Sequence, residues 1–107
     1  MLKLFTMLIT LAVSCPASVL AGAPGAERQA QLLYLLKHDC GSCHGMTRKG
    51  GLGPALLPEN LQKRSRELLV LTVLDGRPGT PMPPWRGQLS EEEASWLVDV
   101  LLRGEDL

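Results

Sequence analysis

Aromatic residues are scarce in this chain of 107 residues, which has two tryptophans, one tyrosine and one phenylalanine. It also has only three cysteines, and its 11 basic residues equal its 11 acidic residues, so the formal net charge is zero. So few cysteines exclude a disulfide-rich scaffold, and the absence of net positive charge argues against a nucleic-acid-binding protein. The hydrophobic content of 45% excludes a disordered composition, and the length allows one small domain.

The N-terminal residues have the pattern of a secretory signal peptide. Lys3 precedes an apolar run, and Val19 and Ala21 occupy the small-residue positions of a cleavage site. We therefore expect a cleaved signal peptide over residues 1–21 and one exported domain over residues 22–107.

Two other uses of this segment are weaker. A retained membrane anchor would need ~20 apolar residues, and the run is shorter than that. Lipid attachment at Cys15 is disfavoured because the leucine of LAVSC lies one place too far upstream. No stable membrane anchor is expected.

The mature domain is short of material for a core. Its aromatic residues are Tyr34, Trp85 and Trp96, and its cysteines are Cys40 and Cys43. Domains of this size usually need a disulfide set, a metal or another staple. Because two cysteines cannot form a disulfide set, we expect another group to fill the centre of the fold.

Helical periodicity covers the start of the mature domain, and no segment of the chain is a convincing strand. Apolar residues recur at three- and four-residue steps on one face that leads into Cys43 and His44: Ala26, Ala30, Leu33, Leu36 and Cys40. The pattern predicts a helix whose end directs the two cysteines toward the core.

Two more helices are expected further along. Ser65 can cap the segment RELLVLTVLD, which is apolar on most sides, should be buried, and should stop at Gly76. The sequence SEEE at Ser90–Glu93 is a capping box that opens a closing helix, with one apolar face formed by Ala94, Leu97, Val98 and Leu101. The glycine- and proline-rich segments between the helices, RKGGLGPALLPENL and GRPGTPMPPWRGQ, are expected to be loops.

The motif Cys40-Gly-Ser-Cys43-His44 could serve three chemistries. A thioredoxin-like dithiol needs a strand and a parallel sheet, which this chain does not offer. A structural zinc site needs four ligands, and the one further local candidate, His38, would crowd them into one helix end. In an exported helical chain the motif favours covalent haem, with thioethers at Cys40 and Cys43 and His44 as the proximal iron ligand. A porphyrin would also fill the missing core.

The sixth ligand of such an iron is expected from Met82. His38 and Met46 lie too close to His44 in sequence to reach the opposite side. Prolines flank Met82 in GTPMPPW and restrict the loop, so that little entropy is lost when the thioether is held. The alternative is that Met82 fills a gap in the core, as methionine commonly does.

These residues resemble the class I c-type cytochromes over nearly the whole mature chain. CGSCH is similar to the haem-attachment motif of that family, PMPPW to its distal methionine strap, and GLGPAL to its proximal loop. The resemblance implies an all-α cytochrome c fold, with three main helices around one covalent haem c. It also implies that the carbonyl of Pro54 accepts a hydrogen bond from the far nitrogen of His44.

The segments GTPMPPWRG and SEEEASWLVDVLLRG look more specifically like the cytochrome c55X group, periplasmic carriers found with the haem d-containing nitrite reductase of denitrifying bacteria. The resemblance implies a periplasmic one-electron carrier, most simply a donor to nitrite reductase. An accessory redox role in haem d assembly and a haem-based redox or gas sensor are the alternatives. An enzyme is not expected, because histidine and methionine together saturate the iron.

The charge distribution indicates how a carrier would meet its partner. Between His44 and Arg86 the basic residues Arg48, Lys49, Lys63, Arg64, Arg66, Arg77 and Arg86 outnumber the acidic Glu59, Glu67 and Asp75. From Gly87 onward acidic residues dominate. We expect a basic surface around the haem edge that steers an acidic redox partner, unless these are ordinary solvated charges. One or two of these arginines, or the Trp85 indole, are candidates for pairing with the haem propionates.

Overall fold

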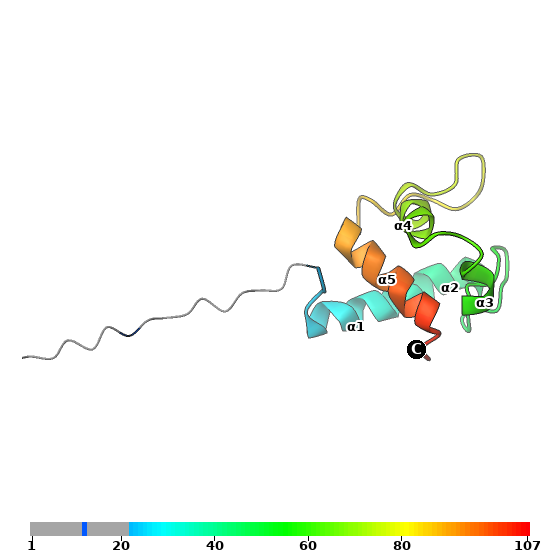
Figure 1. Ribbon diagram of the computed structural model, residues 1–107. Coiled ribbons are helices and arrows are strands. Elements are labelled where there is room, and N and C mark those ends of the chain that lie inside the picture. The colour runs from blue at the N-terminus through cyan, green and yellow to red at the C-terminus, as the bar shows by residue number, and fades with distance from the viewer. Residues whose placement is uncertain (1–11, 13–21) are drawn as a thin grey trace, which may run out of the picture.

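The computed structural model describes residue 12 and residues 22–107. Apart from Ala12, the predicted signal peptide lies outside the described residues, so it stays a prediction. The described chain forms six helical segments: α1 (Ala26–Leu35), η1 (Leu36–Cys40), α2 (Gly41–His44), α3 (Pro58–Leu61), α4 (Arg66–Asp75) and α5 (Glu91–Arg103). Residues 12 and 22–107 contain no strand, and the expected all-α class is confirmed (Figure 1).

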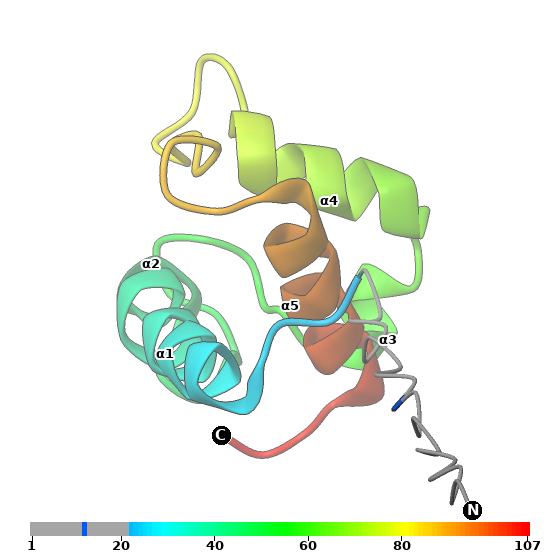
Figure 2. The ribbon, with the colours of Figure 1, turned by 90° about the vertical axis from the view of Figure 1, so that its left-hand side faces the viewer.

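The helix α5 is the centre of the arrangement. It packs against α1, α3 and α4, and Figure 2 shows it between the first helix on one side and α4 on the other. The core is aliphatic and, among the described residues, consists of Leu32, Leu36, Leu61, Leu69, Val70, Leu74, Leu89, Ala94, Leu97, Val98, Val100 and Leu101. Within the described residues, no helix is both long and apolar enough to cross a membrane.

The first helix is continuous from Ala26 to His44, but its buried face differs from the expected one. Leu32 and Leu36 enter the core, whereas Ala26 and Ala30 are exposed. An alanine side chain contributes little buried area, so the larger leucines decide the rotation of the helix. The sequence pattern also missed η1, a π-helical segment that ends at Cys40. Such segments often occur at functional sites.

The helix α4 begins and ends where the sequence predicted. The Ser65 hydroxyl accepts a hydrogen bond from the Leu68 amide, and Gly76 follows the last residue with φ of 67°. The expectation that α4 is buried on most sides is wrong, because Leu68 and Leu71 are 45% and 51% exposed. The helix packs on α5 along one face, through Leu69, Val70 and Leu74, and Leu68 and Leu71 lie on its exposed side.

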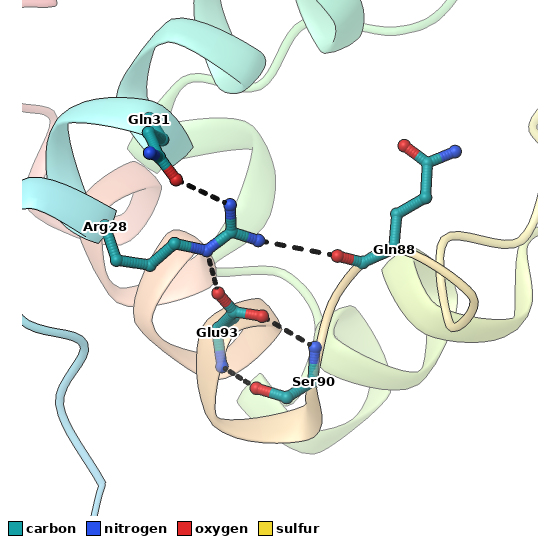
Figure 3. A network of polar contacts seen from close by, with 5 residues as sticks. All are labelled: Arg28, Gln31, Gln88, Ser90 and Glu93. Atoms are coloured by element: carbon teal, nitrogen blue, oxygen red, sulfur yellow. Dashed lines mark hydrogen bonds and ion pairs between the residues drawn. The ribbon is translucent and has the colours of Figure 1, made fainter.

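The N-terminus of α5 has the predicted capping box and an ion pair that the sequence did not predict. Ser90 accepts from the Glu93 amide at 3.1 Å, and the Glu93 carboxylate accepts from the Ser90 amide at 3.0 Å. The same carboxylate pairs with Arg28 of α1, which also donates to Gln31 and to the carbonyl oxygen of Gln88 (Figure 3). Arg28 therefore ties the first helix to the start of the last one.

The short helix α3 was expected to be part of a loop. Pro58 stands at its first turn, where a missing N–H costs nothing, and Leu61 turns into the core. One turn carries too little periodicity to be recognised in a sequence.

Candidate haem site

The two cysteines of the motif lie one helical turn apart at the end of the first helix. Cys40 is the last residue of η1 and packs against the core, whereas Cys43 in α2 is exposed, and neither is in a disulfide. Burial, with the charge of Asp39 beside it, raises the pKa of the Cys40 thiol to about 11. Because neither cysteine is in a disulfide, both sulfur atoms are free for covalent attachment. They lie on a helix end that leads directly into His44.

The imidazole of His44 is oriented by one backbone group. Its Nδ1 lies 2.7 Å from the carbonyl oxygen of Pro54. A carbonyl oxygen can only accept, so Nδ1 carries the proton and donates. The lone pair then resides on Nε2, which is the tautomer required of a metal ligand. The contact implied for Pro54 by the family resemblance is present.

The loop after His44 folds back onto the end of α2. The amides of Gly50 and Gly53 donate to the carbonyl oxygens of His44 and Cys43, each at 2.8 Å. A Cβ atom on Gly53 would lie 2.8 Å from both Nδ1 and Cε1 of His44, so the loop can cover the ring edge only if this residue is glycine. The sequence pattern does not single out Gly53 by itself, although the glycine-rich run GGLG is a signal for a close backbone approach.

Met82 lies in a loop that closes on itself after α4. The Arg77 amide donates to the Met82 carbonyl at 3.2 Å. Gly76, which precedes Arg77, has positive φ, and a Cβ there would lie 2.6 Å from the Met82 carbonyl oxygen. Gly76 therefore does more than end the helix, because it lets the two ends of the loop meet.

The exit of this loop is attached to the last turn of α4. The amides of Trp85 and Arg86 donate to the carbonyls of Val73 and Leu74 at 3.2 and 3.0 Å. Figures 1 and 2 agree that the loop, drawn in yellow, lies on the same side of α5 as α2, which ends in His44. Met82 itself is half-buried.

Trp85 is half-buried and packs against the core beside this loop. None of the side-chain hydrogen bonds found among residues 22–107 uses its indole N–H, and no buried side-chain polar atom there lacks a partner, so this N–H is open to solvent. The group is thus available to an acceptor outside the protein, and Trp85 stays one of the candidates for pairing with a haem propionate. No contact in the structure tests that role.

Two arginines expected in the basic surface are paired instead. Arg66 binds Asp99 of α5 through two bonds of 2.7 and 2.8 Å, and Arg86 binds Asp75 at 2.8 and 3.1 Å. Hydrogen bonding to these arginines lowers the pKa of both carboxyl groups. Arg48 donates to the Glu105 carbonyl, and Lys49 and Arg77 form no ion pair among residues 22–107.

The donor atoms of this region fit a covalently attached haem. Two free thiols lie one turn apart, the histidine beside them presents Nε2, and a loop with a methionine thioether lies on the same side of α5. Nitrogen and thioether sulfur are the axial ligand pair of electron-transfer haem proteins. Within residues 12 and 22–107, no group of three or more His, Cys, Asp or Glu side chains is arranged as a metal cluster.

Comparison with known proteins agrees with this chemistry. Residues 27–100 match the family model described as cytochrome C oxidase, cbb3-type, subunit III. The chain is 60% identical over 98 residues to cytochrome c55X of Pseudomonas aeruginosa, with 91% of this chain and 82% of that one covered. It is 44% identical over 105 residues to cytochrome c55X of Paracoccus denitrificans, with 98% of each chain covered.

A solved structure and a larger protein are also similar. The structure titled c-type cytochrome NirC has a TM-score of 0.75 and 65% identity, with 77% of this chain and 96% of that chain covered. The dihydro-heme d1 dehydrogenase of Pseudomonas aeruginosa is 39% identical over 94 residues, which are 88% of this chain but 18% of that protein. The chain belongs to the c-type cytochromes, which hold haem c covalently, and within them to the cytochrome c55X family.

Proposed function

We propose that this protein is a periplasmic one-electron carrier with one haem c, attached at Cys40 and Cys43 and ligated by His44 and Met82. The observation that carries the proposal is the His44–Pro54 hydrogen bond. It leaves Nε2 of His44 free to bind a metal and holds the imidazole ring in one orientation. Haem c supplies a reversible one-electron couple when it is bound. If His44 and Met82 both held the iron, no coordination place would remain for a substrate, which favours a carrier over an enzyme.

Each residue has a distinct task in this proposal. Pro54 holds the proton on Nδ1 of His44 and prevents ring rotation. Gly53 lets the loop backbone lie against the ring edge. The loop closed by Gly76 and Arg77 presents the thioether of Met82 with little entropy left to lose. Trp85, or Arg77, pairs with a propionate.

The proposed physiological partner is the dissimilatory nitrite reductase, as electron acceptor. Support comes from the similarity to the cytochrome c55X relatives, and the docking surface is proposed around Arg48, Lys49 and Arg77. Arg86 and Arg66 contribute less to this surface than their sequence suggested, because a carboxylate cancels each charge.

A second candidate function has a specific observation in its favour. The similar segment of the dihydro-heme d1 dehydrogenase makes up a small part of a protein named for oxidation of a haem d1 precursor. Dehydrogenation of such a precursor releases two electrons and two protons, and a monohaem carrier accepts one electron. Two oxidised copies of this protein would then be reduced for each precursor oxidised, with the protons released to water.

The two functions are distinguished by the direction of electron flow. Stopped-flow mixing of the reduced protein with nitrite reductase should oxidise it rapidly if the donor role is correct. Mixing of the oxidised protein with the dehydrogenase and its dihydro-haem d1 should reduce it, two protein molecules per substrate, if the assembly role is correct. Failure of both reactions would contradict a role in either process.

A further inference from the structure

The loop that presents Met82 contains one side chain that bridges its two halves. The Thr80 hydroxyl donates to the Arg77 carbonyl at 2.7 Å. The hydroxyl oxygen of Thr80 also accepts a longer hydrogen bond from the Met82 amide, at 3.4 Å. The Thr80 amide donates to the same Arg77 carbonyl at 3.0 Å. The hydroxyl thus connects the start of the loop to the backbone of Met82.

Few other hydrogen bonds hold this loop. The Met82 backbone has one further hydrogen bond in the loop, from the Arg77 amide to its carbonyl at 3.2 Å, and the prolines at 81, 83 and 84 donate no hydrogen bonds. The residues from Arg77 to Pro81 are exposed and outside the core. Because the loop has little burial and few backbone donors, its local stability depends on a small number of hydrogen bonds.

We propose that Thr80 is a positioning residue that controls how readily Met82 leaves its place. The inference rests on the proposed role of Met82 as distal ligand and extends it to a group that does not touch the iron. When the hydroxyl is present, the loop is held closed from inside. When it is absent, the Met82 backbone can swing away without any change in the core or in the first helix.

The test uses the complete protein with haem attached and three threonine variants. Thr80→Val keeps the β-branched shape and removes the hydroxyl, whereas Thr80→Ser keeps the hydroxyl. Thr72→Val is the matched control, since the Thr72 hydroxyl also donates to a backbone carbonyl, that of Leu68 at 2.7 Å, but inside α4. Met82→Ala is the reference for a fully released ligand.

Two quantities are measured: the rate at which the reduced protein binds carbon monoxide, and the hydrogen exchange rate of the Met82 amide. We expect Thr80→Val to raise both roughly three- to tenfold, in line with the loss of one hydrogen bond. Thr80→Ser should restore both rates to within about twofold of the parent, and Thr72→Val should leave both unchanged.

The outcomes separate this inference from the proposed function. If Met82→Ala binds carbon monoxide rapidly while Thr80→Val behaves like the parent in both measurements, the inference is overturned and the ligation stands. If Met82→Ala binds no faster than the parent, the proposed ligation is wrong and the inference falls with it. Equal acceleration by Thr80→Val and Thr72→Val would also overturn the inference, because a general loss of stability would then explain it.

Discussion

At the scale of single residues, the site is shaped by where side chains are missing. Gly53 lies against the ring of His44, and Gly76 lies against the carbonyl of Met82, in both cases closer than a Cβ allows. Each glycine lets a stretch of backbone approach a proposed axial ligand. The positions of the two proposed ligands thus depend on glycines in the neighbouring loops.

The cost of a side chain at Gly53 can be measured. Gly53→Ala places a methyl group 2.8 Å from Nδ1 of His44, so the loop or the ring must shift. We expect a loss of about 1–3 kcal/mol in unfolding free energy, as for other overpacked sites, and a changed reduction potential. Gly87→Ala is the control, since a Cβ there meets nothing within 4 Å. Equal stability of both variants in denaturant titrations would contradict this view of Gly53.

Replacement of Met82 tests the proposed distal ligand directly. Met82→Ala should keep the haem attached, because the two cysteines are untouched, and should lower the reduction potential, since a thioether ligand raises it. The reduced variant should bind carbon monoxide. A parent-like absorption spectrum and potential would exclude Met82 as a ligand.

At the scale of helices, side chains distant in sequence hold the elements together. Arg28 pairs with Glu93, 65 positions later, and Arg66 pairs with Asp99, 33 positions later. The first pair joins α1 to α5, and the second joins α4 to α5. Both use the C-terminal helix as their common support.

The Arg28–Glu93 pair predicts a pH dependence of stability. The bond to Arg28 lowers the pKa of Glu93, so the stabilisation is present above the ordinary carboxyl pKa and is lost as pH falls through the lowered value. The unfolding free energy of Arg28→Ala should therefore fall less than that of the parent protein between about pH 5 and pH 3. Arg64→Ala, at a residue with no ion pair among residues 22–107, should follow the parent curve.

At neutral pH, the capping box should contribute to the unfolding free energy independently of the Arg28–Glu93 ion pair. Ser90→Ala removes the acceptor for the Glu93 amide and should cost about 1 kcal/mol of unfolding free energy. Thermal unfolding followed by circular dichroism measures this effect. Loss of the pH dependence in Ser90→Ala as well would mean that the cap, rather than Arg28, sets the pKa of Glu93.

At the scale of the whole molecule, the hydrophobic core is small for a chain of this length. It contains only leucine, valine and alanine, with both tryptophans at its edge. We expect Cys40→Ala combined with Cys43→Ala to prevent stable folding of the protein, because haem c would no longer be retained as part of the core. Recovery of a compact, cooperatively unfolding apoprotein would contradict this expectation.

The charge surface predicts a salt dependence of electron transfer. The Debye length falls from ~10 Å at 0.1 M to ~3 Å at 1 M salt, so a basic docking surface should give a steep decline in the second-order rate. Lys49→Glu with Arg77→Glu should reproduce that decline at low salt. Glu91→Gln at the start of α5 should change stability by ~0.3–1 kcal/mol with little effect on the rate. A flat salt response in stopped-flow experiments would place docking on another face.

The sequence by itself predicted the haem chemistry of the family and the ends of the two later helices. The motif CGSCH, the caps at Ser65 and Ser90 and the strap PMPPW each occupy a few adjacent residues, so their physical consequences are local and can be predicted without a fold. The helix starting at Arg66 and the one starting at Glu91 accordingly begin where the pattern placed them.

The tertiary structure alone decided which groups meet across the chain. The first helix buries Leu32 and Leu36 rather than its alanines, and Leu68 and Leu71 stay exposed. Arg66 and Arg86 form ion pairs with carboxylates. The tertiary structure also placed Gly53 against His44 and closed the Met82 loop on Gly76. These outcomes depend on the rotation of each helix about its axis and on how the loops return to it. Such rotations are set by the packing of all the helices at once, and no local stretch of sequence contains that information.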